Sequence, residues 1–367
     1  MDRRPRAGPR SIALASASVA LTLVVLEAAF RVARVPVGTV QINRATVRRS
    51  DNPRLRFELR PGGVAHAEVE YRVNDLGLRG PETPIEKPTG VRRVAVLGDS
   101  IAFGYWVADE QGFARQLERL LNEVPSAAGR VEVLNFGVPG YNLDQEIEAL
   151  RSKALALAPD LVVVLVCLND LEGIFSYELG LVQERSERGR TPLGRAREWL
   201  VERSWLFSWV EYRLTELEAR RSFVKAKNPL EGPLYAEAVG QQKKALQGQL
   251  AVLRSLLASR GIPGMVVVVP VLGHRFERYP HRELHAAIVA AAEAEALAAI
   301  DLLDCFSAYE FRDLRVDVVH PSPLGHRVAA HAVRDALCAQ GWLCAAAPNG
   351  PPCTGYRPSD FPSLRGY

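Results

Sequence analysis

Three short segments that lie far apart in the chain carry the residue types of a hydrolytic site. Gly98–Ser100 follows an apolar run, Asn169 follows another, and Asp317–His320 lies near the end of the 367-residue chain. Together they offer a hydroxyl nucleophile, an amide that can donate to an oxyanion, and an imidazole base with a carboxylate to orient it. These groups form the minimum set for acyl transfer through a serine.

The local context of Ser100 and His320 suits these two roles. The run Val94–Leu97 ends at Gly98, which permits the sharp turn that a serine nucleophile needs at the end of a strand. We interpret Asp99 as a residue that holds this turn through backbone hydrogen bonds. Asp317 precedes His320 by three residues, so its carboxylate can fold back onto Nδ1 of the imidazole. That arrangement leaves Nε2 free to take the serine proton.

Two further residues are candidate donors to the oxyanion. Gly137 follows the second apolar run, and glycine lets the backbone approach a substrate closely. Asn169 ends the most apolar run of the chain, and its side-chain amide can donate to the same oxygen. Each also has a plain structural interpretation, because Gly137 begins a Gly-Val-Pro-Gly turn and an asparagine commonly caps a helix or forms an Asx turn.

Around these segments the chain alternates between strand-like and helix-like patterns. The patterns predict strands over residues 91–97, 131–136, 161–168, 265–271 and 299–303. They predict helices over residues 112–124, 143–158, 241–259, 285–297 and 325–339. Such alternation predicts an α/β fold in which helices cover both faces of a parallel sheet. Open sheets of this kind bind their ligands at the carboxyl ends of the strands.

In this order and spacing, the segments around Ser100, Gly137, Asn169 and Asp317–His320 resemble the four sequence blocks of the SGNH/GDSL hydrolase superfamily. The resemblance covers residues 91–340 apart from an insertion. It implies a flavodoxin-like three-layer α/β/α sandwich with a five-stranded parallel sheet, and Ser–His–Asp catalysis on esters. The N-terminal anchor, the lead-in segment and the insertion resemble a membrane-anchored bacterial envelope branch of this superfamily.

The resemblance also implies the role of each site residue. Ser100 is the implied nucleophile and first oxyanion donor, Gly137 the second donor and Asn169 the third, and Asp317 and His320 complete the triad. One position departs from the pattern, because the third block usually begins with glycine and this chain has Cys167 there. A larger side chain at that position raises the question of whether the backbone differs locally.

The N-terminal segment Ser11–Phe30 is apolar except for Glu27 and is long enough to cross a bilayer, which takes about 20 residues. We interpret it as an uncleaved single-pass anchor. A cleaved signal peptide is the rival interpretation, although no small-residue cleavage site follows the segment; a buried helix is a third. Residues 1–60 contain twelve arginines against four acidic residues, whereas the whole chain has a net charge of only +4. The basic excess therefore flanks the apolar segment, which favours a membrane surface over a nucleic acid as partner.

The composition divides the chain into four parts. Residues 1–37 form the basic segment and anchor, residues 38–90 a linker with a small β element, residues 91–343 the hydrolase domain, and residues 344–367 an irregular tail. Within the hydrolase domain, residues 173–240 break the α/β rhythm and carry three tryptophans. We interpret this stretch as a helical insertion that forms a lid or a wall of the substrate site, with a simple packing appendage as the equal alternative.

The cysteines bear on the compartment. Cys338, Cys344 and Cys353 crowd towards the Pro- and Gly-rich tail, where a disulfide would staple a loop in an oxidising compartment. Cys167 lies in an apolar run and is interpreted as a buried small residue, while Cys305 is left unassigned. No pair has the spacing of zinc ligands, so we expect no metal. These features favour an extracytoplasmic, periplasmic catalytic domain.

Taken together, the sequence predicts a membrane-anchored serine esterase, an O-acyl hydrolase that acts on a small-molecule, glycan or lipid ester of the cell envelope without a cofactor. The same residues would serve an acyltransferase that moves an acyl group to a glycan hydroxyl. A non-catalytic glycan-binding or assembly protein on the same fold is the alternative from another class, and the oligomeric state is left open. His274, His281 and His285 follow the fourth predicted strand and are interpreted as residues of a solvated loop.

Overall fold

The structure is a computed structural model, and it describes residues 9–33, 35, 39–66, 69–123, 129–168, 191–211, 213–214 and 233–343. The chain forms two compact units. Met1–Arg44 and Glu184–Lys227 make up the first unit, and Ala45–Gln183 and Asn228–Tyr367 make up the second. The central part of the stretch predicted as an insertion therefore belongs to the same unit as the N-terminal segment.

The first unit contains α1 (Pro9–Val32), α7 (Pro192–Arg203) and a further helical stretch at residues 205–211. In α1, Ala13–Val32 is long and apolar enough to cross a membrane, and none of it is buried. Helix α7 begins in the way its sequence predicts, since Pro192 occupies the first turn and Thr191 Oγ1 accepts a hydrogen bond from the amide of Gly194 at 3.0 Å. The helix α2 (Thr39–Thr46) then leads the chain from the first unit into the second.

Two small hairpins precede the main sheet of the second unit. In the first, β1 (Val47–Arg49) pairs with β2 (Phe57–Leu59), and in the second, β3 (Val64–His66) pairs with β4 (Glu70–Arg72). Tyr71 in β4 is fully buried between two exposed neighbours, as the polar–apolar alternation predicts for a half-exposed strand.

The main sheet has five parallel strands in the order β6-β5-β7-β8-β9. Their bounds are β5 (Val91–Leu97), β6 (Arg130–Asn135), β7 (Leu161–Val166), β8 (Gly264–Val268) and β9 (Ala298–Asp301). This is the flavodoxin-like order, in which the first strand of the sheet lies between the second and the third. The predicted fold class is confirmed, and every predicted strand is present.

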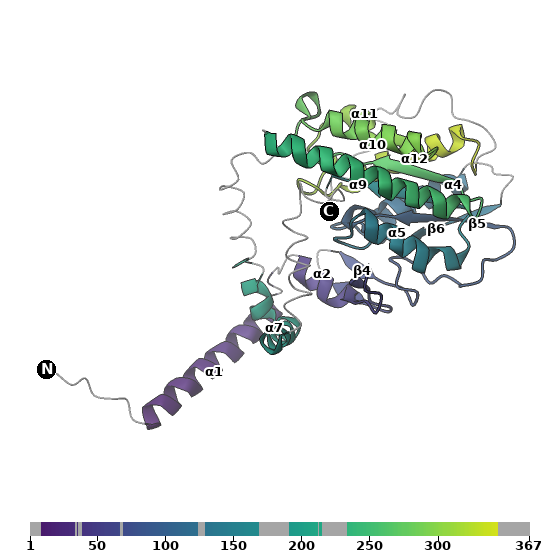
Figure 1. The fold of residues 1–367 in the computed structure, drawn as a ribbon. Coiled ribbons are helices and arrows are strands. Elements are labelled where there is room, and N and C mark those ends of the chain that lie inside the picture. Colours follow the sequence, from purple (N-terminus) through teal and green to yellow (C-terminus); the bar gives the residue numbers. More distant parts are fainter. Residues whose placement is uncertain are drawn as a thin grey trace. The chain divides into compact units, whose positions relative to one another are not determined.

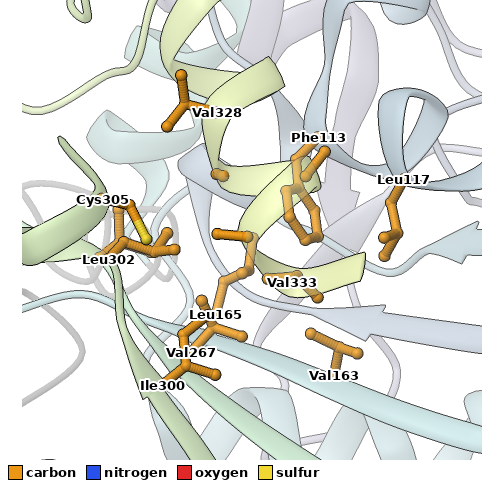
Figure 2. Packing of buried hydrophobic residues seen from close by; sticks show 14 of the residues in the cluster. Phe113, Leu117, Val163, Leu165, Val267, Ile300, Leu302, Cys305, Val328 and Val333 are labelled. Atoms are coloured by element: carbon orange, nitrogen blue, oxygen red, sulfur yellow. The ribbon is translucent and has the colours of Figure 1, made fainter. Parts of the chain in front are cut away.

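Helices cover both faces of this sheet (Figure 1). One face packs against α4 (Phe113–Glu123), α11 (Leu302–Ser307) and α12 (Pro323–Ala339), and the other against α5 (Leu143–Ser152), α9 (Pro233–Ala258) and α10 (Arg282–Ala294). Alternate residues of each strand enter opposite cores, because successive side chains of a strand point to opposite faces. Figure 2 shows the first core, in which Val163 and Leu165 of β7 approach Phe113, Leu117 and Val333.

Most helix ends lie within three residues of the prediction, and two helices differ by more. The helix predicted over residues 143–158 is α5 followed by a short 3-10 turn at Ala154–Leu157, because Lys153 leaves the helical region of backbone space with φ −131° and ψ −58°. The helix predicted from residue 241 begins eight residues earlier, at Pro233. Proline suits the first helical position because it has no amide hydrogen to leave unsatisfied there.

The cysteines with described structure fall into two kinds. Cys167 is a buried thiol, as predicted. Cys305 and Cys338 are both disulfide-bonded. The prediction of a disulfide therefore holds for Cys338 and extends to Cys305, which the sequence alone left unassigned. Cys344 and Cys353 lie outside the described residues.

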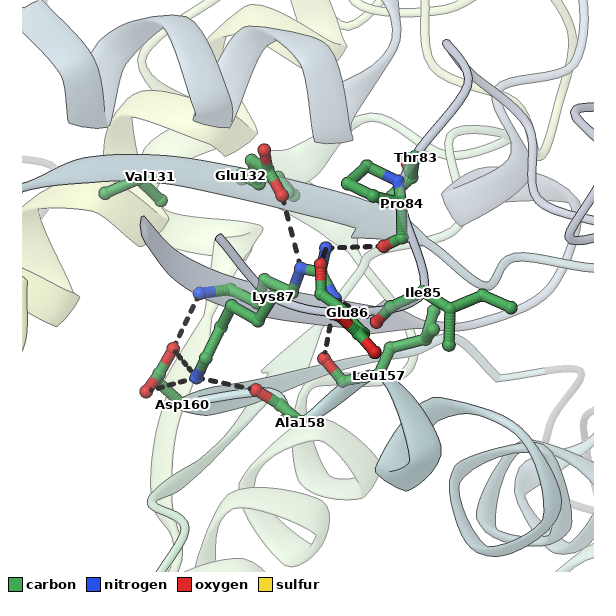
Figure 3. Close-up of polar contacts among 12 residues, drawn as sticks. Thr83, Pro84, Ile85, Glu86, Lys87, Val131, Glu132, Leu157, Ala158 and Asp160 are labelled. Atoms are coloured by element: carbon green, nitrogen blue, oxygen red, sulfur yellow. Dashed lines mark hydrogen bonds and ion pairs between the residues drawn. The ribbon is translucent and has the colours of Figure 1, made fainter. Parts of the chain in front are cut away.

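A buried arginine ties the lead-in segment to the start of the sheet. Arg93 in β5 is fully buried, and its guanidinium donates to the carbonyl oxygens of Pro84 at 2.7 Å and of Ile85 and Leu157 at 3.0 Å. Beside it, Lys87 donates to Asp160 and to the carbonyl oxygen of Ala158, all at 2.9 Å (Figure 3). The planar fork of a guanidinium can reach several carbonyl groups at once, which an ammonium group cannot.

Substitution Arg93→Lys should therefore lower the free energy of unfolding by about 3 kcal/mol, because the carbonyl groups of Pro84, Ile85 and Leu157 lose donors and a fully buried guanidinium is replaced. Arg92→Lys is the matched control, since Arg92 is the next residue and its side chain is half exposed at 3.2 Å from Asp160. We expect this control to change stability by less than about 0.5 kcal/mol. Urea titration of the three proteins measures both values, and equal losses in the two variants would contradict this account.

Candidate active site

The turn that carries Ser100 is built from three consecutive residues. Gly98 directly follows strand β5. Its φ of +155° lies in the region that favours glycine, and an added Cβ would come within 2.6 Å of Ala102 Cβ. Asp99 then caps the short helix α3 (Ser100–Phe103), and its Oδ1 accepts a hydrogen bond from the Ile101 amide at 2.8 Å. Asp99 thus holds the turn as predicted, and Ser100 is the first residue of the helix.

The loop before α12 folds His320 back onto Asp317. Asp317 Oδ1 accepts hydrogen bonds from the amides of Val319 and His320, both at 2.8 Å, and Asp317 Oδ2 lies 2.7 Å from His320 Nδ1. Two residues before Asp317, the Arg315 guanidinium donates a hydrogen bond to the carbonyl oxygen of Leu272 at 2.9 Å. This bond attaches the loop to the segment after β8. The three-residue spacing therefore lets the Asp317 carboxylate fold back onto His320 Nδ1, as the sequence indicated.

The two parts of the site meet at the carboxyl edge of the sheet. His320 Nε2 lies 2.9 Å from Ser100 Oγ, although 220 positions separate the two residues in the chain. With Asp317 on the other nitrogen, the three side chains form one continuous hydrogen-bonded series. Ser100 is only 9% exposed, so its hydroxyl sits in a largely desolvated position where hydrogen bonds to the imidazole are strengthened.

The electrostatics of Asp317 favour its charged form. Burial by itself would raise the pKa of this carboxyl group, but hydrogen bonds from His320 and the two amides, together with the charge of His320, lower the pKa to about 2. Asp317 is therefore a carboxylate throughout the neutral range. A fixed negative charge on the Nδ1 side stabilises the imidazolium that forms when Nε2 takes a proton.

Trp106 is a site residue that the sequence analysis missed. Its indole Nε1 donates a hydrogen bond to Asp317 Oδ2 at 2.9 Å, on the same oxygen that accepts from His320. The backbone of Trp106 has a positive φ of +68°, and its amide donates to the hydroxyl of Tyr71 at 2.7 Å. The small β element thus reaches the site through Tyr71. The only signal in the sequence was the aromatic pair that directly follows Gly104.

Of the two further candidate oxyanion donors, the structure describes Gly137 but not Asn169. Gly137 lies against α3, and an added Cβ would come within 2.3 Å of the Phe103 nitrogen, so only glycine fits. Its amide donates to the side-chain oxygen of Asn135 at 2.9 Å, and that bond must open or be shared before the amide can serve an oxyanion. Asn169 lies outside the described residues.

Cys167 stands where the third sequence block of the superfamily usually has glycine, and the structure shows what its thiol contacts. The Cys167 thiol donates to Asp99 Oδ2 at 3.3 Å, and Asp99 in turn caps the helix that carries Ser100. Nearby, burial raises the pKa of the Glu146 carboxyl group well above its usual range, and the charge of Asp99 adds to this increase. Cys167 thus supplies a weak donor to the capping carboxylate.

The histidines after β8 form a buried cluster, so the interpretation of a solvated loop is wrong for His281 and His285. His281 is 2% exposed and His285 is fully buried. His285 Nδ1 lies 2.8 Å from Asp301 Oδ1, and its Nε2 lies 3.0 Å from the Tyr279 hydroxyl, which accepts the Val271 amide at 2.9 Å. The imidazole therefore joins β9 to the segment after β8. In the part of the chain that the structure describes, no group of three or more His, Cys, Asp or Glu is placed to hold a metal ion.

Comparison with solved structures found several similar chains. The chain is similar to an acetyl xylan esterase named AlAXEase (16% identity, TM-score 0.41, covering 68% of this chain and 98% of the other). It is also similar to the acetylxylan esterase Axe2 of Geobacillus stearothermophilus, with 17% identity and a TM-score of 0.42 over 67% of this chain and 94% of the other. A lipase/acylhydrolase of Enterococcus faecalis has 16% identity and a TM-score of 0.41 over 68% of this chain and 96% of the other. Among curated protein sequences, none matches the chain.

The fold and the sequence together define the class. A five-stranded parallel sheet between two helical layers, with a serine at the turn after β5, its first strand in chain order, is the architecture of the SGNH hydrolases. The sequence profile of the GDSL-like lipase/acylhydrolase family matches residues 96–328, which is more than half of the chain. The chain belongs to this family and is a hydrolase that acts on ester bonds. The predicted family and enzyme class are confirmed.

The bond from Trp106 to Asp317 generates a prediction. Trp106→Phe keeps an aromatic ring in place and removes the N–H donor, so the carboxylate should hold the imidazole less firmly. A hydrogen bond to a charged group contributes about 1.5–3 kcal/mol, so we expect kcat to fall on the order of tenfold, with KM unchanged. Steady-state hydrolysis of an activated ester measures both constants. Trp342→Phe, in the second unit beyond α12, is the control, and an equal fall in both variants would contradict the assigned contact.

Proposed function

We propose that the protein is a serine esterase in which Ser100, His320 and Asp317 act as a catalytic triad. The observation that carries this proposal is the unbroken series of contacts from Asp317 Oδ2 to His320 Nδ1 at 2.7 Å and from His320 Nε2 to Ser100 Oγ at 2.9 Å. In this geometry a single proton transfer from Ser100 to His320 produces the nucleophile and an imidazolium paired with a carboxylate.

The reaction proceeds in two halves. Ser100 Oγ attacks the ester carbonyl carbon while its proton passes to His320 Nε2, and the tetrahedral intermediate collapses when His320 returns that proton to the departing alcohol. Water then attacks the acyl-Ser100 ester by the same proton transfers, which releases the acid and restores the serine.

The oxyanion of both intermediates needs donors that are already in place. The Ser100 amide is suited to this, because the first amides of a helix have no acceptor within the helix. Gly137 and the side chain of Asn169 complete the proposed set, with the Gly137 amide exchanging its bond to Asn135 for the oxyanion. Removing one such donor typically slows catalysis on the order of a hundredfold to a thousandfold.

The N-terminal helix is the proposed membrane anchor, and the catalytic unit is proposed to lie outside the cytoplasm, in the periplasm. The length and exposure of Ala13–Val32 support the anchor. The disulfide bonds of Cys305 and Cys338 support an oxidising compartment, because such bonds are rare where glutathione keeps thiols reduced. The proposed substrate is therefore an O-acyl ester, such as an acetyl ester, on a glycan or lipid of the cell envelope.

A fluorophosphonate probe tests the proposed triad on the full chain in detergent micelles. The probe labels only an activated serine, so the unmodified protein should be labelled at Ser100, and both Ser100→Ala and His320→Gln should abolish labelling. Ser259→Ala is the control, because this serine is exposed at the end of α9 and should label at the unmodified rate. Labelling that persists in folded Ser100→Ala, or none in the unmodified protein, contradicts the proposal.

A further inference from the structure

The helical stretch at residues 205–211 buries two polar side chains and exposes two large apolar ones, although its tryptophans are partly buried. Ser208 is fully buried and Glu211 is 8% exposed, whereas Phe207 is 41%, Val210 38% and Leu214 51% exposed. The three apolar residues are spaced three and then four positions apart, so they lie on one face of a helix. A helix in water shows the opposite distribution, since burial of its apolar face drives packing.

The inward-facing polar groups are hydrogen-bonded to their neighbours. Arg197 of α7 donates to both carboxylate oxygens of Glu211, with Nη2 at 2.7 Å from each oxygen, and the Ser208 hydroxyl donates to the Ser204 carbonyl oxygen at 2.9 Å. The forked pair joins α7 to the stretch at 205–211. The ion pair between Arg197 and Glu211 therefore holds the two helices together, while the side chains of Phe207 and Val210 remain exposed to solvent.

The same helices are fixed to the carboxyl end of α1. The Glu27 carboxylate accepts hydrogen bonds from the Ser204 hydroxyl at 2.7 Å and from the amides of Trp205 and Leu206 at 2.8 and 3.0 Å. The Trp209 ring meets the Phe30 ring edge to face, with 5.5 Å between centroids. The one acidic residue of the apolar segment is thus explained, because it caps the start of a helix that packs beside it.

These contacts place the helical stretch at 205–211 beside the carboxyl-terminal end of α1. Ala13–Val32 has 20 residues, and at about 1.5 Å per residue it is as long as the hydrocarbon core is thick. In the proposed anchor its carboxyl end lies at the boundary between acyl chains and headgroups. The Trp205 indole donates to the Val35 carbonyl oxygen at 2.7 Å, just beyond the span. Tryptophan is enriched at this boundary because its ring is apolar and its N–H is polar.

Helix α7 exposes apolar groups of the same kind. Leu193 is 82% exposed and Trp199 is 55% exposed, and the Arg203 guanidinium lies 5.0 Å from the centre of the Trp199 ring. An arginine stacked on an exposed tryptophan combines an apolar surface with a cation that can reach lipid phosphates. Helix α7 thus exposes large apolar side chains to solvent, as the stretch at 205–211 does.

We propose that α7 and the stretch at residues 205–211, with Leu214, lie in the headgroup–acyl boundary of a bilayer and form a membrane-interface platform around the end of α1. The proposal rests on the membrane anchor of the proposed function and names a second element that contacts lipid. The platform belongs to Glu184–Lys227, which interrupts the hydrolase unit in the chain between β7 and α9. The hydrolase unit is consequently linked to the bilayer through this segment as well as through α1.

Tryptophan fluorescence in proteoliposomes tests the platform on the full chain. Phosphatidylcholine brominated near the headgroup end of its acyl chains quenches indoles at the boundary, and lipid brominated near the chain ends quenches deeper ones. The emission of Trp199 is obtained by subtracting the fluorescence of the Trp199→Phe variant from that of the unmodified protein. We expect the shallow bromines to remove roughly half of this emission and more than the deep bromines remove. Emission from Trp342, obtained in the same way with Trp342→Phe, should be unaffected.

A charge on the platform face gives a second readout with a matched control. Phe207 and Val252 are both 41% exposed, but Val252 lies on α9 of the hydrolase unit. Phe207→Glu should reduce the quenching of Trp199 by roughly twofold, because a carboxylate at the boundary costs free energy that a water-facing one does not. Val252→Glu should leave the quenching unchanged. Equal effects of the two substitutions contradict the proposal.

Carbonate extraction and probe labelling separate the possible failures. Protein that stays in the membrane after carbonate extraction but shows no lipid quenching of Trp199 has an anchor without a platform, which overturns the proposal; a second copy of the chain covering the apolar face would give this result. Protein that carbonate removes from the membrane lacks the anchor, which also overturns it. Fluorophosphonate labelling of Ser100 is independent of both results, so failure of the platform does not imply failure of the esterase.

Discussion

One hydrogen bond, between Ser100 Oγ and His320 Nε2, is the contact on which the site depends, and the fold provides the conditions for it. The two residues are 220 positions apart in the chain and 2.9 Å apart in space. They meet because all five strands run parallel, so the turn after β5 and the loop before α12 emerge on the same edge of the sheet. Each partner is then fixed locally, Ser100 by the cap at Asp99 and His320 by the carboxylate of Asp317.

Much of this arrangement was predictable from the sequence, because it depends on patterns that repeat or that act locally. Buried parallel strands such as Leu161–Val166 read as unbroken runs of valine and leucine, and the strand–helix alternation sets the layers. The turn at Gly98 and the backbone bonds made by Asp317 involve only neighbouring residues, so spacing alone indicated them. The order of the motifs then indicated the family, which the sequence profile confirms.

The remaining features depend on contacts between distant residues, which no local pattern specifies. Neither the donation from Trp106 to Asp317 nor the burial of His285 between Tyr279 and Asp301 could be read from the sequence. Glu27 looked like an interruption of an apolar segment, yet it caps a helix that begins 178 positions later, at Trp205. The partners of Trp106 and Glu27 lie 211 and 178 positions away in the chain, whereas those of His285 are 6 and 16 positions away but belong to other elements.

The central claim is that Ser100 carries the acyl group during turnover, and trapping of the acyl-enzyme tests it most directly. The full chain would be mixed with p-nitrophenyl acetate, quenched in acid before steady state and digested for peptide mass spectrometry. The proposed mechanism predicts an acetyl group on the peptide that contains Ser100, and its absence when His320→Gln is treated in the same way. Ester hydrolysis that proceeds with no acetyl on Ser100, or with acetyl on another residue, would contradict the account.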